Sequence, residues 1–306
     1  MLGVLCGLGS AMAFGANAII TRRGMMRVSS NYIATLSIFF GSLFFLVVNV
    51  ITGDLLGIGG FHWKAYLYWA LSGVIHFALG RTWAYRSIQL LGSNRSNVVT
   101  SLNPVVTIVL AVIILKEEIT PTMALGILFV LGGPLLIILL EPTVSGSQRV
   151  SRTYGKEIDR RTLLLGMFYG IGAAVFWGSS AIFIKFGLKT EGSPVAGSLI
   201  AYVAGSIVVT PSLLLNKEQR QEVFNEGWKS LRVAIFSSLT SSTAQLLRYL
   251  SLGYGAVIVV TLAGRTTPLW VLLLSFLFNR KYESFSQWVL LGNGLLVIGS
   301  ILVIFH

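Results

Sequence analysis

The sequence predicts an all-α integral membrane protein in which ten transmembrane helices form two inverted five-helix repeats. The first observation is composition: of 306 residues, 54% are hydrophobic and only 11% are charged, with a mean hydropathy of +0.79. A soluble domain carries about 25% charged residues, so this chain lacks the polar surface that water requires. The second observation is that the apolar residues form long unbroken runs, and the third is that the two halves resemble each other.

Ten apolar runs approach or exceed the roughly 20 residues that a spanning helix needs. They lie at 2–21, 32–52, 64–90, 94–115, 121–140, 163–186, 194–215, 231–252, 256–278 and 285–305. Pro121 and Pro194 fall in first helical turns, where proline is tolerated. The first run begins without a basic leader, so we interpret it as a spanning helix rather than a signal peptide. The short alternating pattern of a β-barrel is not seen.

One polar segment divides the chain close to its midpoint. It is rich in Gly, Ser and charged residues, which is typical of a linker. We therefore expect a first five-helix repeat at residues 1–140, a linker loop at 141–161 and a second five-helix repeat at 162–306.

An internal repeat relates these two halves. A shift of 163 residues places "GLGSAMAFGANAIITRRGM" over "GIGAAVFWGSSAIFIKFGL", and glycines coincide throughout. Larger shifts align Gly41 with Gly205, Pro104 with Pro268, Gly126 with Gly292 and Gly133 with Gly299. Glycine abundance alone would explain close helix packing but not this shared order. With five spans per repeat, the halves enter from opposite sides and a two-fold axis lies in the membrane plane.

A family resemblance is carried by the segments "AMAFG", "AAVFWGSSAIFIK" and "NPVVTIVLAVIILKEEIT", and by the glycine spacing that follows the last of them. In these segments the chain resembles the EamA-type proteins of the drug/metabolite transporter superfamily. The resemblance covers essentially the whole chain. It implies a ten-helix transporter of small organic metabolites whose cavity is lined by helices 1, 3, 4, 6, 8 and 9. The segment "LFNRKYESF" departs from the family's usual Gly-Glu turn after the ninth helix, so that loop is expected to differ.

Loop charges predict an orientation. Most basic residues lie in the odd-numbered loops, at 22–27, 86–95, 149–161, 217–232 and 280–281, which favours placing these loops in the cytoplasm and both termini outside. The family resemblance instead favours cytoplasmic termini. We expect a multi-pass protein of the cell (inner) membrane, in contact with membrane lipids. The sequence leaves oligomeric state, transport direction and coupling ion open.

Three arginines lie inside predicted spans: Arg81, Arg248 and Arg265. Arg81 and Arg265 are about ten residues from a span end, hence roughly 15 Å deep. An arginine at that depth usually faces a cavity or a partner. Arg248 lies nearer an end, from which it can extend outward. No Asp or Glu lies inside any predicted span, so either the backbone and water bind the guanidinium groups or a solute supplies the negative charge.

Polar residues at helical spacing complete the predicted substrate site. They are Gln245 beside Arg248, Tyr85 beside Arg81, Thr261 beside Arg265, Asn97 and Asn103 before Pro104, and Asn17, Trp177 and Ser180 on the first and sixth helices. Pro104 and Pro268 occupy equivalent repeat positions, which predicts a shared hinge. His76 can titrate, but we interpret a lone histidine in an aromatic-rich helix as a structural hydrogen-bonding residue.

The sequence contains no nucleotide-binding loop and no metal-spaced His/Cys cluster, so no enzyme activity, cofactor, metal or nucleic-acid partner is expected. The hypothesis is a secondary transporter for an amino acid, organic acid or phosphorylated metabolite. A lipid-handling (flippase-like) protein is the alternative, in which the arginines bind a lipid phosphate. A multidrug exporter is less favoured, because buried carboxylates to balance an organic cation are missing.

Overall fold

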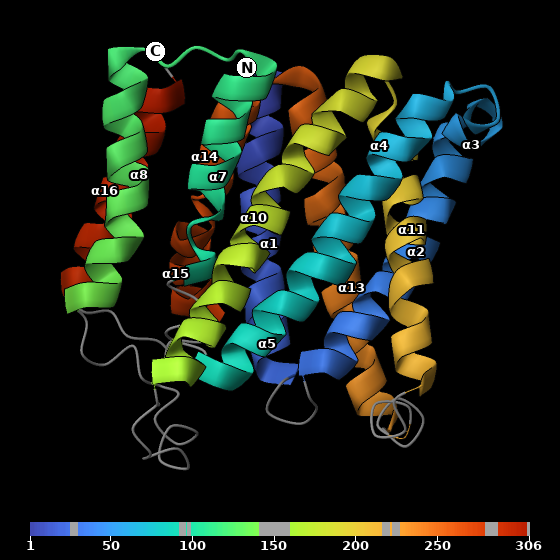
Figure 1. Ribbon diagram of the computed structural model, residues 1–306, viewed down its shortest axis with the longest axis horizontal. Helices are drawn as coiled ribbons and strands as arrows, with labels where there is room; N and C mark the ends of the chain where they lie inside the picture. The colour runs from blue at the N-terminus through green and yellow to red at the C-terminus, as the bar shows by residue number, and fades with distance from the viewer. Residues whose placement is uncertain are drawn as a thin grey trace.

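The computed structural model describes residues 1–24, 30–91, 96, 99–140, 160–215, 221, 227–278 and 287–304. The described secondary structure is helical, and the helices run between two ends of one bundle (Figure 1). Both termini lie at the same end, which we call the N-terminal face (Figure 1).

The helices of the first half follow the predicted spans. They are α1 (Leu2–Gly24), α2 (Ser30–Thr52), the short α3 (Asp54–Ile58), α4 (Trp63–Gly73), η1 (Val74–Gly80), α5 (Arg81–Leu91), α7 (Asn103–Leu110), η2 (Ala111–Leu115) and α8 (Pro121–Leu140). Segments α4, η1 and α5 together make the third span, and α7 with η2 makes most of the fourth. The predicted order of five spans is confirmed.

The second half repeats this order. Its helices are α10 (Arg160–Thr190), α11 (Pro194–Leu215), α13 (Trp228–Tyr254), α14 (Val257–Gly264), α15 (Thr267–Phe278) and α16 (Gln287–Ile304). Segments α14 and α15 together make the ninth span. The prediction of an all-helical membrane protein with ten spans is therefore confirmed.

Length and hydropathy of the described helices single out eight of these segments, all but the third and the eighth span. Five described helical stretches are long and apolar enough to cross a bilayer: Leu2–Ile20, Thr35–Thr52, Arg160–Thr190, Pro194–Pro211 and Val257–Leu274. Shorter apolar stretches are Asn103–Leu115, Pro121–Gly133 and Leu290–Ile304. Large apolar side chains such as Phe39, Leu128 and Ile207 are more than half exposed, which lipid tolerates and water does not.

Several spans are not the uniform α-helices that the sequence analysis predicted. Residues 74–80 and 111–115 form π-helical turns, and non-helical turns at 101–102 and 265–266 divide the fourth and ninth spans. Pro104 and Pro268 follow those turns as the second residues of α7 and α15, where proline costs no hydrogen bond. The hydropathy pattern missed these interruptions because the apolar sequence continues through them.

Contacts across the bundle show the two-fold relation between the halves. The Ser42 and Ser206 hydroxyl oxygens lie 2.8 Å apart, and these residues occupy equivalent positions in the repeats. Helices α8 and α16 lie side by side (Figure 1). There a Cβ at Gly126 would lie 2.8 Å from the carbonyl oxygen of Gly299, and a Cβ at Gly133 would lie 2.4 Å from that of Gly292. Each contact is the counterpart of the other, as an inverted repeat requires.

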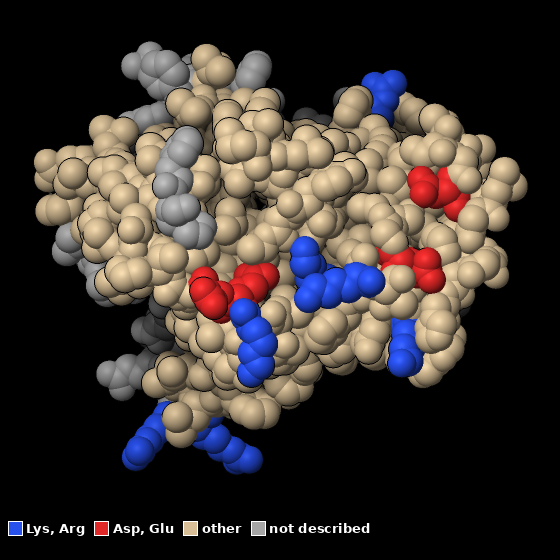
Figure 2. All heavy atoms as spheres, turned by 90° about the horizontal axis from the view of Figure 1, so that it is seen from above, with Lys and Arg blue, Asp and Glu red and all other residues tan. Residues whose placement is uncertain are grey.

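Charged side chains cap helix ends at the N-terminal face. The Glu117 carboxylate accepts the backbone N–H groups of Val257 at 2.6 Å and Ile258 at 2.9 Å, at the start of α14. Lys185 Nζ donates to the carbonyl oxygens of Leu252 at 2.7 Å and Gly255 at 2.8 Å, at the end of α13. Each charge has the sign that stabilises its helix end. Viewed from above, this face carries both acidic and basic groups, several of which lie next to one another (Figure 2).

Candidate functional site

The candidate site is built around one turn of α10, residues 177–180, which we call the site turn. Ser180 is fully buried, and its hydroxyl donates to the carbonyl oxygen of Trp177 at 2.8 Å. Small residues let neighbouring helices approach this turn closely: a Cβ at Gly178 would lie 2.7 Å from the carbonyl oxygen of Asn103. The turn is therefore in direct contact with the fourth span.

The third span contacts the site turn through His76. The His76 Nδ1 atom lies 3.1 Å from the Ser180 hydroxyl oxygen, and Trp177 Nε1 donates to the carbonyl oxygen of His76 at 3.0 Å. His76 lies within the π-helical segment η1. Such segments are frequent at functional sites, because their wider turn changes which backbone groups are available for bonding. Here the His76 carbonyl receives a side-chain donor from another helix.

Helix α13 adds two predicted residues to the same turn. Gln245 is buried, and its Nε2 lies 3.4 Å from His76 Nε2. Arg248, three residues later and half-buried, directs Nη2 at the Ser180 hydroxyl oxygen, 3.5 Å away. The spacing of three places both side chains on one face of α13, as predicted. Ser180 is therefore shared by His76 and Arg248.

Arg81 begins α5 directly after the π-helical segment. Its guanidinium carbon lies 5.9 Å from the centre of the Phe77 ring, an arrangement in which a cation is attracted to the aromatic face. Phe77 in turn packs against His76 at 4.9 Å and against Tyr202 at 4.5 Å, measured between ring centres. These contacts join Arg81 to the His76 side of the site.

Arg265 reaches the other side of the site turn. Its Nη2 donates to Oδ1 of Asn103, at the start of α7. The Thr107 hydroxyl oxygen lies 3.0 Å from the carbonyl oxygens of both Asn103 and Gly178, which fixes α7 against the site turn. Arg265 is also the C-terminal cap of α14, where a cation is favoured by the helix dipole.

An equivalent but uncharged contact lies in the first repeat. Asn17 is the repeat counterpart of Ser180, and its Oδ1 accepts hydroxyl hydrogen bonds from Ser237 at 2.8 Å and Thr240 at 3.1 Å. Thr240 is the counterpart of His76. Asn17 therefore joins α1 to α13 in the way that Ser180 joins α10 to the third span.

The structure thus brings together most of the predicted site residues. Six of them belong to the site turn or are linked to it through its direct contacts: Trp177, Ser180, Gln245, Arg248, Asn103 and Arg265. Thr261 is half-buried one turn before Arg265, and Asn17 contributes the equivalent contact of the first repeat. Asn97 and the side chain of Tyr85 lie outside the described residues. Pro104 and Pro268 follow the breaks of their spans, and their role as hinges stays a prediction.

The sequence analysis interpreted His76 as a structural hydrogen-bonding residue, and it forms hydrogen bonds with three of the predicted site residues, Ser180, Trp177 and Gln245. An ionisable ring inside a span is also a common mark of a functional site. Arg248, predicted to be able to extend outward, points to Ser180 instead. Among the described residues, no group of His, Cys, Asp or Glu is arranged to hold a metal ion.

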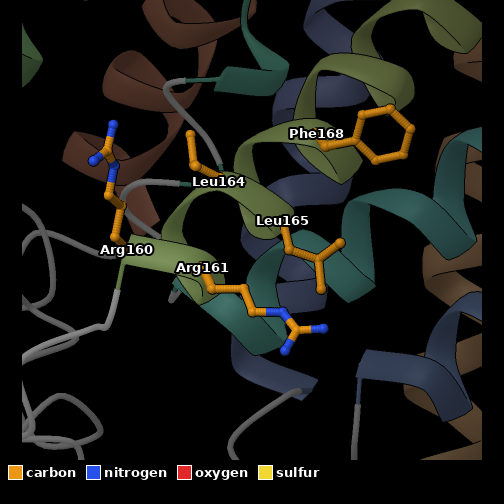
Figure 3. Close-up of a pocket in the computed structure, with 5 residues that line it drawn as sticks. All are labelled: Arg160, Arg161, Leu164, Leu165 and Phe168. Atoms are coloured by element: carbon orange, nitrogen blue, oxygen red, sulfur yellow. The ribbon is translucent and has the colours of Figure 1, made fainter.

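A hollow of about 560 Å³ lies elsewhere, at the start of α10 (Figure 3). It is lined by Arg160, Arg161, Leu164, Leu165 and Phe168, and the two guanidinium groups point away from each other (Figure 3). Ser180 lies twenty residues further along this helix than Arg160, hence about 30 Å away. The hollow is therefore separate from the site turn.

Comparisons with known proteins agree with this architecture. The model of the EamA-like transporter family matches residues 1–139 and again residues 164–305. A solved structure described only as "Crystal structure of protein" is 13% identical, with a TM-score of 0.76, over 98% of this chain and 95% of that chain. At that identity the likeness shows the fold alone. A search of curated proteins finds no match. Because the family matches nearly the whole chain twice, this multi-pass membrane protein belongs to the EamA-like transporter family.

Proposed function

We propose that this transporter carries a small organic anion or zwitterion, such as an amino acid, an organic acid or a phosphorylated metabolite. One observation carries the proposal: Arg248 and Arg265 contact the site turn or its neighbour Asn103, and Arg81 packs on Phe77, whose ring contacts His76 of the same site. The acidic residues that the structure describes lie instead at helix ends: Asp54, Glu117, Glu118 and Glu191.

The energetic argument concerns the cost of positive charge at membrane depth. Insertion of an arginine at the centre of a span costs about 2.5–3.5 kcal/mol, and neutral partners such as Ser180 and Asn103 offset only part of it. A carboxylate or phosphate forms charge-assisted hydrogen bonds with guanidinium groups that are about twice as strong as neutral ones. An anionic solute therefore gains more at this site than a neutral or cationic one.

Transport by alternating access follows from the inverted repeat. In such folds the site lies between the halves near the bilayer midplane, beside broken helices. The breaks before Pro104 and Pro268 lie at equivalent positions, and Asn103 and Arg265 adjoin them. We propose these breaks as hinges. The caps formed by Glu117 and Lys185 would hold the N-terminal face closed, and the loop charges favour placing that face outside the cell.

A lipid-handling role is the second candidate, because the hollow at Arg160 and Arg161 is open to the lipid side of α10 and is lined by exposed Leu164 and Phe168. A basic pocket with apolar walls suits a phospholipid headgroup and chain. Multidrug export stays less favoured for the reason given by the sequence: no span carries a carboxylate for an organic cation.

The test is counterflow of radiolabelled L-glutamate, succinate and glucose 6-phosphate in proteoliposomes, after a thermal-shift screen with the same anions. We expect saturable uptake of at least one anion, and loss of its thermal stabilisation in Arg81→Ala, Arg248→Ala and Arg265→Ala. Arg232→Ala is the matched control, because Arg232 lies on α13 over the Trp228 ring, 5.4 Å from its centre and away from the site turn. Equal stabilisation of parent and site variants would contradict the arginine assignment, and lipid scrambling without anion uptake would favour the second candidate.

A further inference from the structure

We propose that this protein takes up a proton together with its anion, and that His76 is the group that holds the proton. This inference rests on the proposed anion-transport function and adds a coupling ion to it. His76 is suited to the role by position, because it contacts the site turn on one side and α13 on the other.

The hydrogen bonds around His76 fit a neutral ring. With the Gln245 amide in this orientation, Nε2 donates to His76 Nε2, which then carries a lone pair. The ring proton then lies on Nδ1, from which it is donated to the Ser180 hydroxyl oxygen. Ser180 donates its own proton to the Trp177 carbonyl and is therefore free to accept from both His76 and Arg248. Every donor in this network has an acceptor only when His76 is neutral.

The charges around His76 are positive. Arg248 approaches through the shared Ser180, and Arg81 approaches from α5, where its guanidinium packs on Phe77 beside the imidazole. Among the described residues, the other titratable groups near this cluster are the phenols Tyr202 on α11 and Tyr249 on α13, which are neutral at physiological pH. A second proton on His76 would therefore meet two like charges and, within the described part of the chain, no carboxylate.

An anion bound by Arg81 and Arg248 removes the electrostatic repulsion between the two arginines and a protonated His76. Once the two guanidinium charges are balanced, a proton on His76 gains attraction to the anion in place of repulsion from the arginines. The coupling is reciprocal, because protonated His76 adds a third cation and strengthens anion binding by the same factor. Rotation of the Gln245 amide would turn its oxygen toward the new N–H. Anion and proton therefore enter the site together and leave it together.

The coupling is measured in proteoliposomes that contain a trapped pH-sensitive dye. The probe is the radiolabelled anion that is transported fastest among L-glutamate, succinate and glucose 6-phosphate. It is applied at about pH 7.5, where carboxylates are fully ionised and phosphate monoesters almost so. We expect about one proton to enter per anion, and an acidic exterior to drive accumulation of the anion.

Two histidine variants separate coupling from folding. His76→Gln keeps a hydrogen-bonding side chain but cannot hold the proton, so the protons carried per anion should fall at least tenfold. His62→Gln is the matched control, because His62 is exposed at the start of α4 and lies outside the site. Its proton-to-anion ratio should equal that of the parent.

The outcomes distinguish the two proposals. Anion uptake without acidification, or an unchanged proton-to-anion ratio in His76→Gln, would overturn the role of His76 and leave the anion transporter standing. No uptake of any of the three anions would overturn both proposals.

A second measurement does not depend on a functional variant. The chain has three histidines, so nuclear magnetic resonance of protein with nitrogen-labelled histidine can follow each ring. We expect His76 to carry its proton on Nδ1 without anion and to become doubly protonated when the transported anion saturates the site. A ring that stays neutral in both conditions, or that carries its proton on Nε2, would contradict the proposal.

Discussion

The contact between α1 and α13 and the contact between α10 and the third span are repeat counterparts with different chemistry. In the first, Asn17 accepts from Ser237 and Thr240, and the contact is neutral. In the second, Ser180 meets His76 and Arg248. The same helix crossing therefore exists with and without charge, which shows that the fold does not need the cations. We infer that the contact between α10 and the third span, with Arg248 from α13, supplies charge that the substrate requires.

The largest expected effect comes from Arg248→Ala, which removes a cation from the charged contact. A hydrogen bond to a charged group contributes about 1.5–3 kcal/mol, so we expect anion affinity to fall about 10- to 100-fold. Binding of the transported anion by calorimetry measures this loss, and Arg232→Ala serves as the control. An unchanged affinity would mean that the two contacts differ in sequence but not in function.

Two glycines at equivalent positions of the repeats, Gly15 and Gly178, allow a second comparison of the neutral and the charged contact. A Cβ at Gly15 would lie 2.9 Å from Trp270 Cβ, and a Cβ at Gly178 would lie 2.7 Å from the Asn103 carbonyl oxygen. Overpacking of this kind costs about 1–3 kcal/mol, so Gly15→Ala and Gly178→Ala should both lower thermal stability.

Only Gly178→Ala should also weaken anion binding, because it displaces Asn103, the partner of Arg265. Melting curves with and without the transported anion separate these effects. Loss of anion-dependent stabilisation in Gly15→Ala alone would contradict the assignment of anion binding to the contact at Gly178.

Asn17→Ala tests the neutral contact. The substitution leaves the hydroxyl groups of Ser237 and Thr240 without this acceptor, which should cost about 1 kcal/mol of stability. We expect initial uptake rates to fall about threefold, well below the effect of Arg248→Ala. A fall as large as that of Arg248→Ala would place the main substrate contact at Asn17 rather than at the charged contact.

The smallest expected effect is at the two-fold axis, where Ser42 meets Ser206. Hydrogen bonds between membrane helices contribute about 0.6 kcal/mol on average, so Ser42→Ala should lower stability by about that amount. A double-mutant cycle with Ser206→Ala measures the pair directly. A coupling energy of zero would show that this contact does not help to hold the halves together.

The sequence predicted the membrane fold because lipid imposes its constraints along the whole chain. Ten runs of sufficient length, and glycines in the same order in both halves, were enough to define the spans and their inversion. The π-helical turns at 74–80 and 111–115 were not predicted, because the apolar sequence continues through them unchanged. The contact of the Trp177 side chain with the His76 carbonyl was not predicted either, because the two residues are about a hundred positions apart.

The sequence predicted many of the residues of the candidate site but not the contacts between them. Depth in the span singled out Arg81 and Arg265, and spacing linked Gln245 to Arg248. The pairing of Arg265 with Asn103 depends on how α7 meets α14, which no spacing within one helix reveals. The partners of His76 were not predicted for the same reason, because Ser180 and Gln245 lie in the other half of the chain.

The reciprocal glycine contacts between α8 and α16 have a consequence for how the molecule is assembled. Gly126 meets Gly299 while Gly133 meets Gly292, so each half offers the other a surface like its own. Residues 1–140 and 162–306, produced as two separate polypeptides in one cell, should therefore find each other in the bilayer and co-purify. The covalent connection would serve mainly to raise their effective concentration.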